Sequence, residues 1–78
     1  MSRHIKIFSR DSDTTAEIIK LLSAVSTDYE IELEIEIIEN KDEIYSYCVK
    51  HTPSIMIGSL VIHEGSVPTR QQIIEWFI

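Results

Sequence analysis

The sequence predicts an α/β fold with its elements in the order β-α-β-α-β-β-α, built as a four-stranded mixed sheet with helices on both faces. Three observations predict this order. Short β-branched runs alternate with segments of helical periodicity, residues 31–37 alternate apolar and acidic side chains, and two apolar runs, 55–57 and 60–63, flank a turn. A crossover through a helix makes the first two strands parallel, whereas a tight hairpin makes the last two antiparallel.

The first strand is predicted at residues 5–8, which end at a polar cluster. A helix follows, because apolar residues then recur at the i, i+3, i+4, i+7 spacing of one helical face. These residues are Ile18, Leu21, Leu22 and Val25. Thr14 and Glu17 have the spacing of a capping box at the start of this helix. Ser12 and Asp13 are alternative caps, so the first residue of the helix stays open.

The second strand, residues 31–37, places Glu32, Glu34 and Glu36 on one face, because side chains alternate along a strand. Three like charges in a row need water to screen them, which favours an edge strand that resists pairing with another copy. The stripe is either a solvated face that guards against aggregation or a cation-binding surface, and the pattern favours the solvated face.

A short second helix is predicted to begin near Asn40, which has cap spacing. Its apolar face holds Ile44, Tyr47 and Cys48. The hairpin is expected to turn near residues 58–59, where a glycine stands between the two apolar runs.

The last helix is predicted to follow a loop at residues 64–68, because Thr69 and Gln72 have capping-box spacing. Its apolar residues have the spacing to seal the sheet. They are Ile73, Ile74 and Phe77, with Trp76 as a further contact.

Length and composition narrow the classes of protein. A chain of 78 residues predicts one domain, residues 1–78, and 44% hydrophobic with 26% charged residues is typical of a soluble globular protein. A formal net charge of -6 argues against a general nucleic-acid binder, which needs a basic face. No apolar run approaches the roughly 20 residues of a membrane span. The start of the chain, 1–5, lacks the apolar core of a secretion signal, and one cysteine forms no internal disulfide, so a cytoplasmic protein is expected.

Residues 47–57, with Thr52-Pro53 before an apolar strand, and the later run 65–69 carry a resemblance to a known family. With the predicted order of elements, the chain resembles the small thioredoxin/glutaredoxin-like proteins, especially the short archaeal and bacterial redox-active disulfide group. The resemblance spans residues 5–77. It implies a thioredoxin-like fold with a cis peptide bond before Pro53, and it implies that the Thr52 backbone groups face outward to pair with an extended substrate.

The family's Cys-x-x-Cys is missing from this chain. Alignment through Phe8 places the two family cysteines on Ser12 and Thr15. Dithiol exchange needs one thiolate to attack and a second thiol to resolve the mixed disulfide, so disulfide oxidoreductase activity is not expected. Ser12 and Thr15 are instead expected to accept hydrogen bonds from unpaired backbone N–H groups at the helix start.

Cys48 is the single sulfur nucleophile, and the resemblance places it at a family glycine rather than at a catalytic thiol. Its helical spacing predicts a packed, inert side chain. The alternative is a reactive thiol whose thiolate is favoured by Lys50 and His51. No metal site is predicted, because only His4, His63 and scattered carboxylates could complete a ligand set, and no cofactor is expected.

The predicted fold gathers the start of the first helix, the Thr52-Pro53 loop and the loop after the hairpin at one end of the sheet. In glutaredoxin-like relatives this rim binds glutathione or an extended peptide, so the resemblance implies the same location here. The predicted binding residues are Arg10, Ser12, Thr15, Lys50, His51, Thr52, Pro53, Gly65 and Ser66. Arg10, Lys50, His51 and Arg70 are expected to give the rim a positive potential.

Three functions remain open from the sequence. The favoured one is a non-catalytic adaptor that binds a protein, an extended peptide or a glutathione-like thiol at this rim. The alternative is a redox protein or sensor that forms a mixed disulfide through Cys48 with glutathione or a partner. A third is an interaction domain that uses the sheet edge or the apolar residues 76–78 as a dimer contact, and a monomer or weak homodimer is expected.

Overall fold

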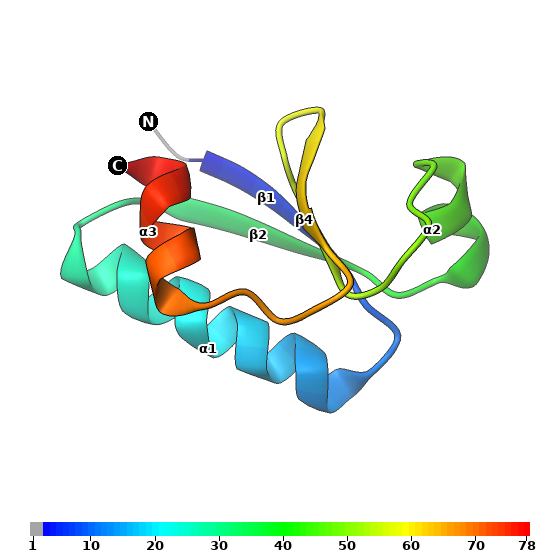
Figure 1. The fold of residues 1–78 in the computed structure, drawn as a ribbon, viewed down its shortest axis with the longest axis horizontal. Helices are drawn as coiled ribbons and strands as arrows, with labels where there is room; N and C mark the ends of the chain where they lie inside the picture. Colours follow the sequence, from blue (N-terminus) through cyan, green and yellow to red (C-terminus); the bar gives the residue numbers. More distant parts are fainter. Residues whose placement is uncertain (1–2) are drawn as a thin grey trace.

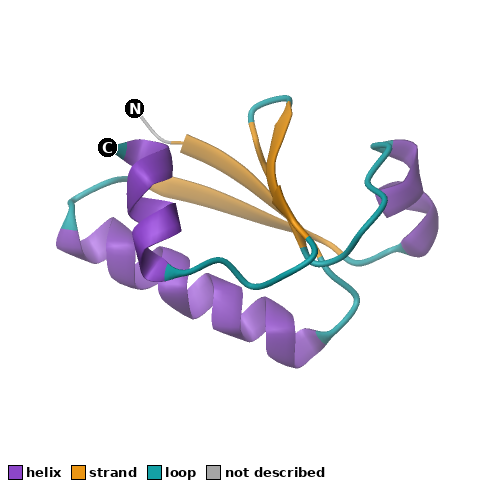
Figure 2. Ribbon diagram, in the orientation of Figure 1, coloured by secondary structure: helices purple, strands orange, loops and turns teal. Residues whose placement is uncertain are grey.

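The computed structural model describes residues 3–78, and the first two residues of the predicted amino-terminal run lie outside this range. The predicted order of elements is confirmed (Figures 1 and 2). The strands are β1 (Arg3–Phe8), β2 (Leu33–Ile38), β3 (Ser54–Ile57) and β4 (Leu60–Glu64), and the helices are α1 (Ser12–Asp28), α2 (Lys41–Ser46) and α3 (Arg70–Phe77).

The four strands form one mixed sheet in the order β2-β1-β3-β4. β1 runs parallel to β2 and antiparallel to β3, and β3 runs antiparallel to β4, as the crossover and hairpin rules predict. β1 therefore lies in the interior of the sheet, while β2 and β4 are its edges. The ladder between β3 and β4 is irregular between Ile55 and Met56.

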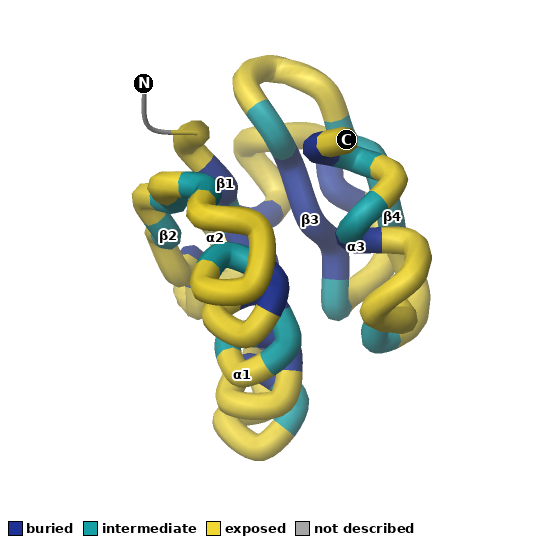
Figure 3. The backbone as a smooth tube through the Cα atoms, turned by 90° about the vertical axis from the view of Figure 1, so that its left-hand side faces the viewer, coloured by how far each residue is buried: buried dark blue, intermediate teal, exposed yellow. Residues whose placement is uncertain are grey.

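The main core lies between the sheet and two helices. In Figure 1, α1 runs beneath the strands with α3 beside it, and Figure 3 shows the buried residues concentrated on the strands and on the helix faces that meet them. Each apolar side chain that is fully removed from water contributes about 1.5–3 kcal/mol, so this cluster supplies most of the driving force for folding. Its buried members are Ile5, Ile7, Ile18, Leu22, Val25, Ile55, Ile73 and Phe77.

A smaller core lies on the opposite face of the sheet, where α2 stands at the far end of the strands (Figure 1). Its buried members are Phe8, Ile38, Ile44, Val49 and Met56. The sheet therefore has helices on both faces, as predicted, but α2 has only six residues and covers one end of its face.

The edge strand β2 begins two residues later and ends one residue later than predicted, so Glu32 precedes it. Glu34 and Glu36 alternate with partly buried apolar residues and are exposed, as predicted. His4 on the neighbouring strand lies between these two glutamates: its Nε2 is 3.1 Å from a carboxylate oxygen of Glu36 and its Nδ1 is 3.5 Å from one of Glu34. Ile37 is 39% exposed, so the inward face of this edge strand is incompletely covered.

The cap of α1 differs from the prediction, whereas the caps of the other helices match it. Asp11 is the N-cap residue, and the Thr14 hydroxyl donates to its Oδ2 at 2.5 Å. The predicted caps, Thr14, Ser12 and Asp13, lie inside the helix, because Asp11 is the last residue in an extended conformation.

The Asn40 side chain accepts from two backbone N–H groups at the start of α2, those of Asp42 and Glu43. Thr69 and Gln72 form the predicted capping box of α3. These short-range polar signals therefore place two of the three helix starts.

Candidate functional site

One end of the sheet brings three chain segments together. Phe8, the last residue of β1, pairs with Ser54 of β3, and Ser54 pairs with Glu64, the last residue of β4. The residues that follow Phe8, precede Ser54 and follow Glu64 therefore leave the sheet at the same end. This register brings the start of α1, the Thr52-Pro53 loop and the Gly65 loop to one end of the sheet, where the sequence predicted them.

Hydrogen bonds hold the Thr52-Pro53 loop on two sides. The Gly65 N–H donates to the Pro53 carbonyl oxygen at 2.8 Å, and the buried Ser54 hydroxyl donates to the His51 carbonyl oxygen. The Thr52-Pro53 peptide bond is cis, the isomer that the family resemblance implies. His51 and Thr52 are exposed and Pro53 is half-buried, so the loop presents a fixed surface to solvent.

The backbone groups of Thr52 form no hydrogen bond within the described residues. Within residues 3–78, no hydrogen bond joins the Thr52 N–H or carbonyl oxygen to another group, and Thr52 lies outside the β3 ladders, which begin at Ser54. A backbone donor and acceptor on an exposed, fixed loop are the groups that an added extended strand requires.

The hydroxyl residues at the family's cysteine positions lie in the first turn of α1. Thr15 is 9% exposed, and its Oγ1 donates to the Asp11 carbonyl oxygen at 3.0 Å. The expected role of Thr15 as an acceptor for backbone N–H groups is therefore wrong: its position inside the helix aims the hydroxyl at the preceding carbonyl oxygen. Ser12 is exposed, and with Thr15 it lines a hollow of about 210 Å³ beside Ile37 and Glu39.

Charges of both signs lie at this end of the sheet. Arg10, Lys50 and His51 are exposed. Two exposed glutamates lie at the same end of the sheet: Glu39 follows the last residue of β2, and Glu64 is the last residue of β4. The rim therefore presents separate cationic and anionic points, whereas the sequence predicted a positive potential there.

Arg70 lies away from the rim. Its Nη2 donates to Asp28 Oδ2 at 2.5 Å, at the carboxyl end of α1, whereas the rim lies at the amino end of that helix. The expectation that Arg70 contributes to the rim is wrong, because the long α1 carries its two ends to opposite sides of the molecule.

Asp11 stands between β1 and α1 at the rim. The hydrogen bond from the Thr14 hydroxyl lowers the pKa of the Asp11 carboxyl below its ordinary value of 3.8, against a smaller opposing effect of desolvation, and backbone N–H groups of Thr14 and Asp13 add to the lowering. This carboxylate is therefore held in its charged form at the start of the helix, where the helix dipole also favours it.

Cys48 is exposed, and the prediction of a packed side chain is wrong. The prediction required the helix to continue through Cys48, but α2 ends at Ser46. Cys48 then adopts a left-handed backbone conformation, with a φ of 62°. Its N–H donates to the Tyr45 carbonyl oxygen at 2.9 Å. The Tyr47 ring contacts that of Phe8, with the centroids 5.2 Å apart, although Tyr47 is 38% exposed.

Two surface hollows meet at Cys48 and Lys50. The larger has a volume of about 520 Å³ and lies between these residues and the edge strand β4, from Val61 to Glu64. The smaller has a volume of about 220 Å³, and Tyr45 closes it. Tyr45 was not among the predicted site residues, although a tyrosine off the apolar face of a short helix is a signal for an exposed aromatic residue.

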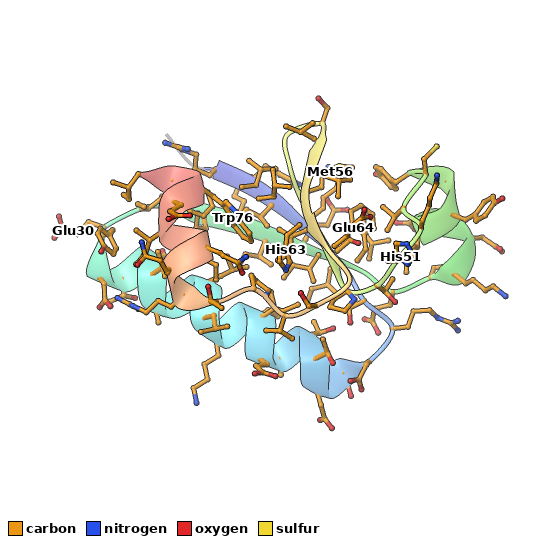
Figure 4. The ribbon with its side chains drawn as sticks, viewed as in Figure 1. Glu30, His51, Met56, His63, Glu64 and Trp76 are labelled. Carbon is orange, nitrogen blue, oxygen red and sulfur yellow. The ribbon has the colours of Figure 1, made fainter. Side chains whose placement is uncertain are left out.

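The loop after β4 contains a second polar contact. His63 Nε2 and Ser66 Oγ are 3.0 Å apart, and the His63 ring lies 5.9 Å from the Trp76 ring, centroid to centroid. Figure 4 shows His63 and Trp76 adjacent between β4 and α3. Ser66 is exposed, and its contact with His63 also holds the loop against β4; no spacing in the sequence predicts this contact.

Across residues 3–78, no three His, Cys, Asp or Glu side chains are arranged to hold a metal ion. In the same range, no helix is both long and apolar enough to cross a bilayer.

Comparison with known proteins gives one match. A family model described as a thioredoxin domain matches residues 3–78, which is nearly the whole chain. Neither the curated proteins nor the solved structures gave a match.

Proposed function

The chain belongs to the thioredoxin-domain family, and from this premise we propose that it is a non-catalytic binding module for an extended peptide segment. Ser12 and Thr15 at the positions of the redox pair support the loss of dithiol chemistry. A hydroxyl forms no disulfide, so neither the attacking nor the resolving step of thiol exchange is available there.

The observation that carries the proposal is the unpaired backbone of Thr52. Its N–H and carbonyl oxygen are free of partners within residues 3–78, on a loop that hydrogen bonds to Gly65 and Ser54 fix on both sides. A peptide that aligns with this loop gains backbone hydrogen bonds without the entropic cost of ordering the loop first. An extended protein segment is the main ligand, and a glutathione-like tripeptide is a smaller ligand that also carries amide N–H and carbonyl groups.

Selection of a displayed library of random linear peptides tests this function, with binding of the selected peptides measured by isothermal titration. The chain is short enough for synthesis in two pieces joined at Cys48, so the amide between His51 and Thr52 is replaceable by an ester. The ester removes only the Thr52 N–H donor and should weaken binding by about two- to tenfold, the range for one hydrogen bond.

Thr52→Val is the matched control, because it removes the hydroxyl and keeps the backbone groups. We expect its affinity to stay within about twofold of the parent, below the effect of one hydrogen bond. A library that yields no linear peptide, or an ester that binds its peptide as tightly as the amide, would contradict the proposed function.

A second candidate function is favoured by the exposure of Cys48. In this function the Cys48 thiolate attacks a disulfide sulfur of oxidised glutathione. The S–S bond of the oxidant breaks, a Cys48–glutathione disulfide forms, and one glutathione leaves as a thiolate that takes up a proton. Lys50 lines the same hollows as Cys48 and offers a positive charge to the incoming anionic peptide.

Cys48→Ser separates the two functions. Under the binding function, this variant keeps the affinity for the selected peptides, because the thiol takes no part in backbone pairing. Under the redox function, the parent protein gains one glutathione, visible by intact-mass spectrometry, and this adduct changes peptide binding. An adduct that forms only after unfolding would rule out the redox function.

A further inference from the structure

Two adjoining hollows on the α2 side of the sheet share Cys48 and Lys50 in their walls. The smaller, of about 220 Å³, has the size of a single large side chain and is closed by Tyr45. Tyr45 is 81% exposed, the most exposed of the large apolar residues in the described range. An aromatic ring that is open to water beside a hollow is the type of residue that dominates binding energy at interfaces.

Residues that line the hollows adjoin the Thr52 loop along the chain. Lys50 precedes Thr52 by two residues, and Glu64, in the wall of the larger hollow, precedes Gly65, whose N–H is bonded to the Pro53 carbonyl oxygen. An extended strand advances about 3.3 Å per residue, so a peptide paired with Thr52 reaches Lys50 within a few residues. His51 lies on the same connection between α2 and β3 (Figure 4).

The charge of the smaller hollow is opposite to that of the chain. The protein has 13 acidic and seven basic residues, yet the residues that line this hollow include the cation Lys50 and no carboxylate. Within residues 3–78, Lys50 takes part in no ion pair. Glu64 lines only the larger hollow, so the carboxylate of a ligand is favoured on the Tyr45 side.

We propose that the Tyr45–Lys50 hollow selects peptide partners that carry an aromatic side chain next to an acidic one. The aromatic side chain packs on Tyr45 and the carboxylate pairs with Lys50, while the peptide backbone pairs with Thr52. This inference rests on the proposed function and adds to it the chemistry of the partner.

Four capped, fluorescently labelled peptides test the inference by fluorescence polarisation. The first carries a phenylalanine followed by aspartate in a threonine and serine background. The second has alanine for the phenylalanine, the third asparagine for the aspartate, and the fourth lysine for the aspartate. We expect the first to bind most tightly and the lysine peptide most weakly, because only the first satisfies both the ring and the cation.

Variants of the protein locate the effect. Lys50→Glu should reverse the preference, so that the lysine peptide binds more tightly than the aspartate peptide. Lys50→Gln should weaken binding of the aspartate peptide by up to about fivefold, the range of an exposed ion pair. Tyr45→Ala should weaken binding of the phenylalanine peptide by about fivefold or more, with little effect on the alanine peptide. All substituted positions are exposed, and circular dichroism checks that the fold is kept.

Lys41→Glu is the matched control for Lys50→Glu. Lys41 is exposed at the start of α2 and lines neither hollow, and its substitution changes the net charge by the same amount. The inference is overturned if Lys41→Glu and Lys50→Glu act alike, if the asparagine peptide binds as well as the aspartate peptide, or if the first peptide does not bind. Peptides from the random library that bind through Thr52 but ignore Tyr45 and Lys50 would overturn this inference alone. Failure of the library and the ester experiments would overturn the proposed function.

Discussion

Thr15 carries a hydroxyl oxygen where a dithiol protein of the family carries a sulfur. Its side chain is nearly buried, and its hydroxyl is committed to the Asp11 carbonyl oxygen at 3.0 Å. The family resemblance places a cysteine at this position, whereas here a hydroxyl hydrogen-bonds within the first turn of α1. Ser12 remains exposed, so the first turn presents a polar side chain to solvent.

Asp11 gives a pH dependence at the residue scale. Its folded-state pKa lies below the ordinary value of 3.8 because the Thr14 hydroxyl hydrogen-bonds to the charged carboxylate. The unfolded state therefore takes up the proton first as pH falls. The stability that Asp11 contributes is fully present above pH 3.8 and is lost as pH falls through the lower, folded-state pKa.

Urea denaturation of Asp11→Asn between neutral and acidic pH measures this contribution. Asparagine is a good N-cap but carries no charge, so the variant should be less stable than the parent at neutral pH and equally stable in acid. Asp13→Asn is the control, since it removes a charge from the same turn without a hydrogen bond from Thr14. If both variants change with pH in the same way, the Thr14 contact is not the cause.

At the scale of the elements, the sequence pattern predicted those features that depend on residues a few positions apart, such as helix caps and strand alternation. The capping box of α3 involves residues three apart, and the alternation of apolar and acidic residues over 31–37 identified an edge strand with one acidic face. The end of α2 was mispredicted, because the apolar spacing continues through Cys48 while the chain leaves the helix after Ser46. The packing of Tyr47 on Phe8, a contact between distant parts of the chain, accompanies that early end.

The first turn of α1 makes a prediction at this scale. Ser12 and Thr15 are three residues apart in a helix, which places their Cα atoms about 5 Å apart, within the range of a disulfide. In a Cys48→Ser background, Ser12→Cys with Thr15→Cys should form an internal disulfide and leave the circular dichroism spectrum unchanged. Mass spectrometry after alkylation, with and without reductant, measures the bond.

The pair Ser12→Cys with Ala16→Cys is the matched control, because Ala16 is the next residue of the same turn and the family pattern does not place a cysteine there. We expect the 12/15 pair to form its disulfide at a less oxidising glutathione ratio than the 12/16 pair. No disulfide in the 12/15 variant would show that the first turn has lost the geometry of the family's redox pair.

The whole molecule depends on one sheet with a large core on one face and a small core on the other. A chain of 78 residues has a free energy of unfolding of about 4–12 kcal/mol. Its Cα radius of gyration of 11.7 Å leaves little interior, so each fully buried side chain carries a large share of that stability.

Substitution of Ile55 tests how much the main core contributes to stability. It is fully buried at the centre of the main core, so Ile55→Ala should lower the free energy of unfolding by about 2–5 kcal/mol and populate the unfolded state at moderate temperature. Leu60→Ala is the control, because Leu60 is 67% exposed and its loss should cost less than about 0.5 kcal/mol. Equal effects of the two substitutions in urea denaturation would contradict the placement of the core.

The sequence by itself determined the order of the elements, the edge position of β2, the caps of α2 and α3 and the absence of a dithiol pair. Each of these follows from residue type and spacing along a few neighbouring residues. Only the tertiary structure decided which side chains face outward at the rim. It exposed Cys48, formed the hollow beside Tyr45, and paired Arg70 with Asp28 across 42 residues of sequence. Such outcomes depend on how distant segments pack, and that packing is a property of the whole chain which no local periodicity encodes.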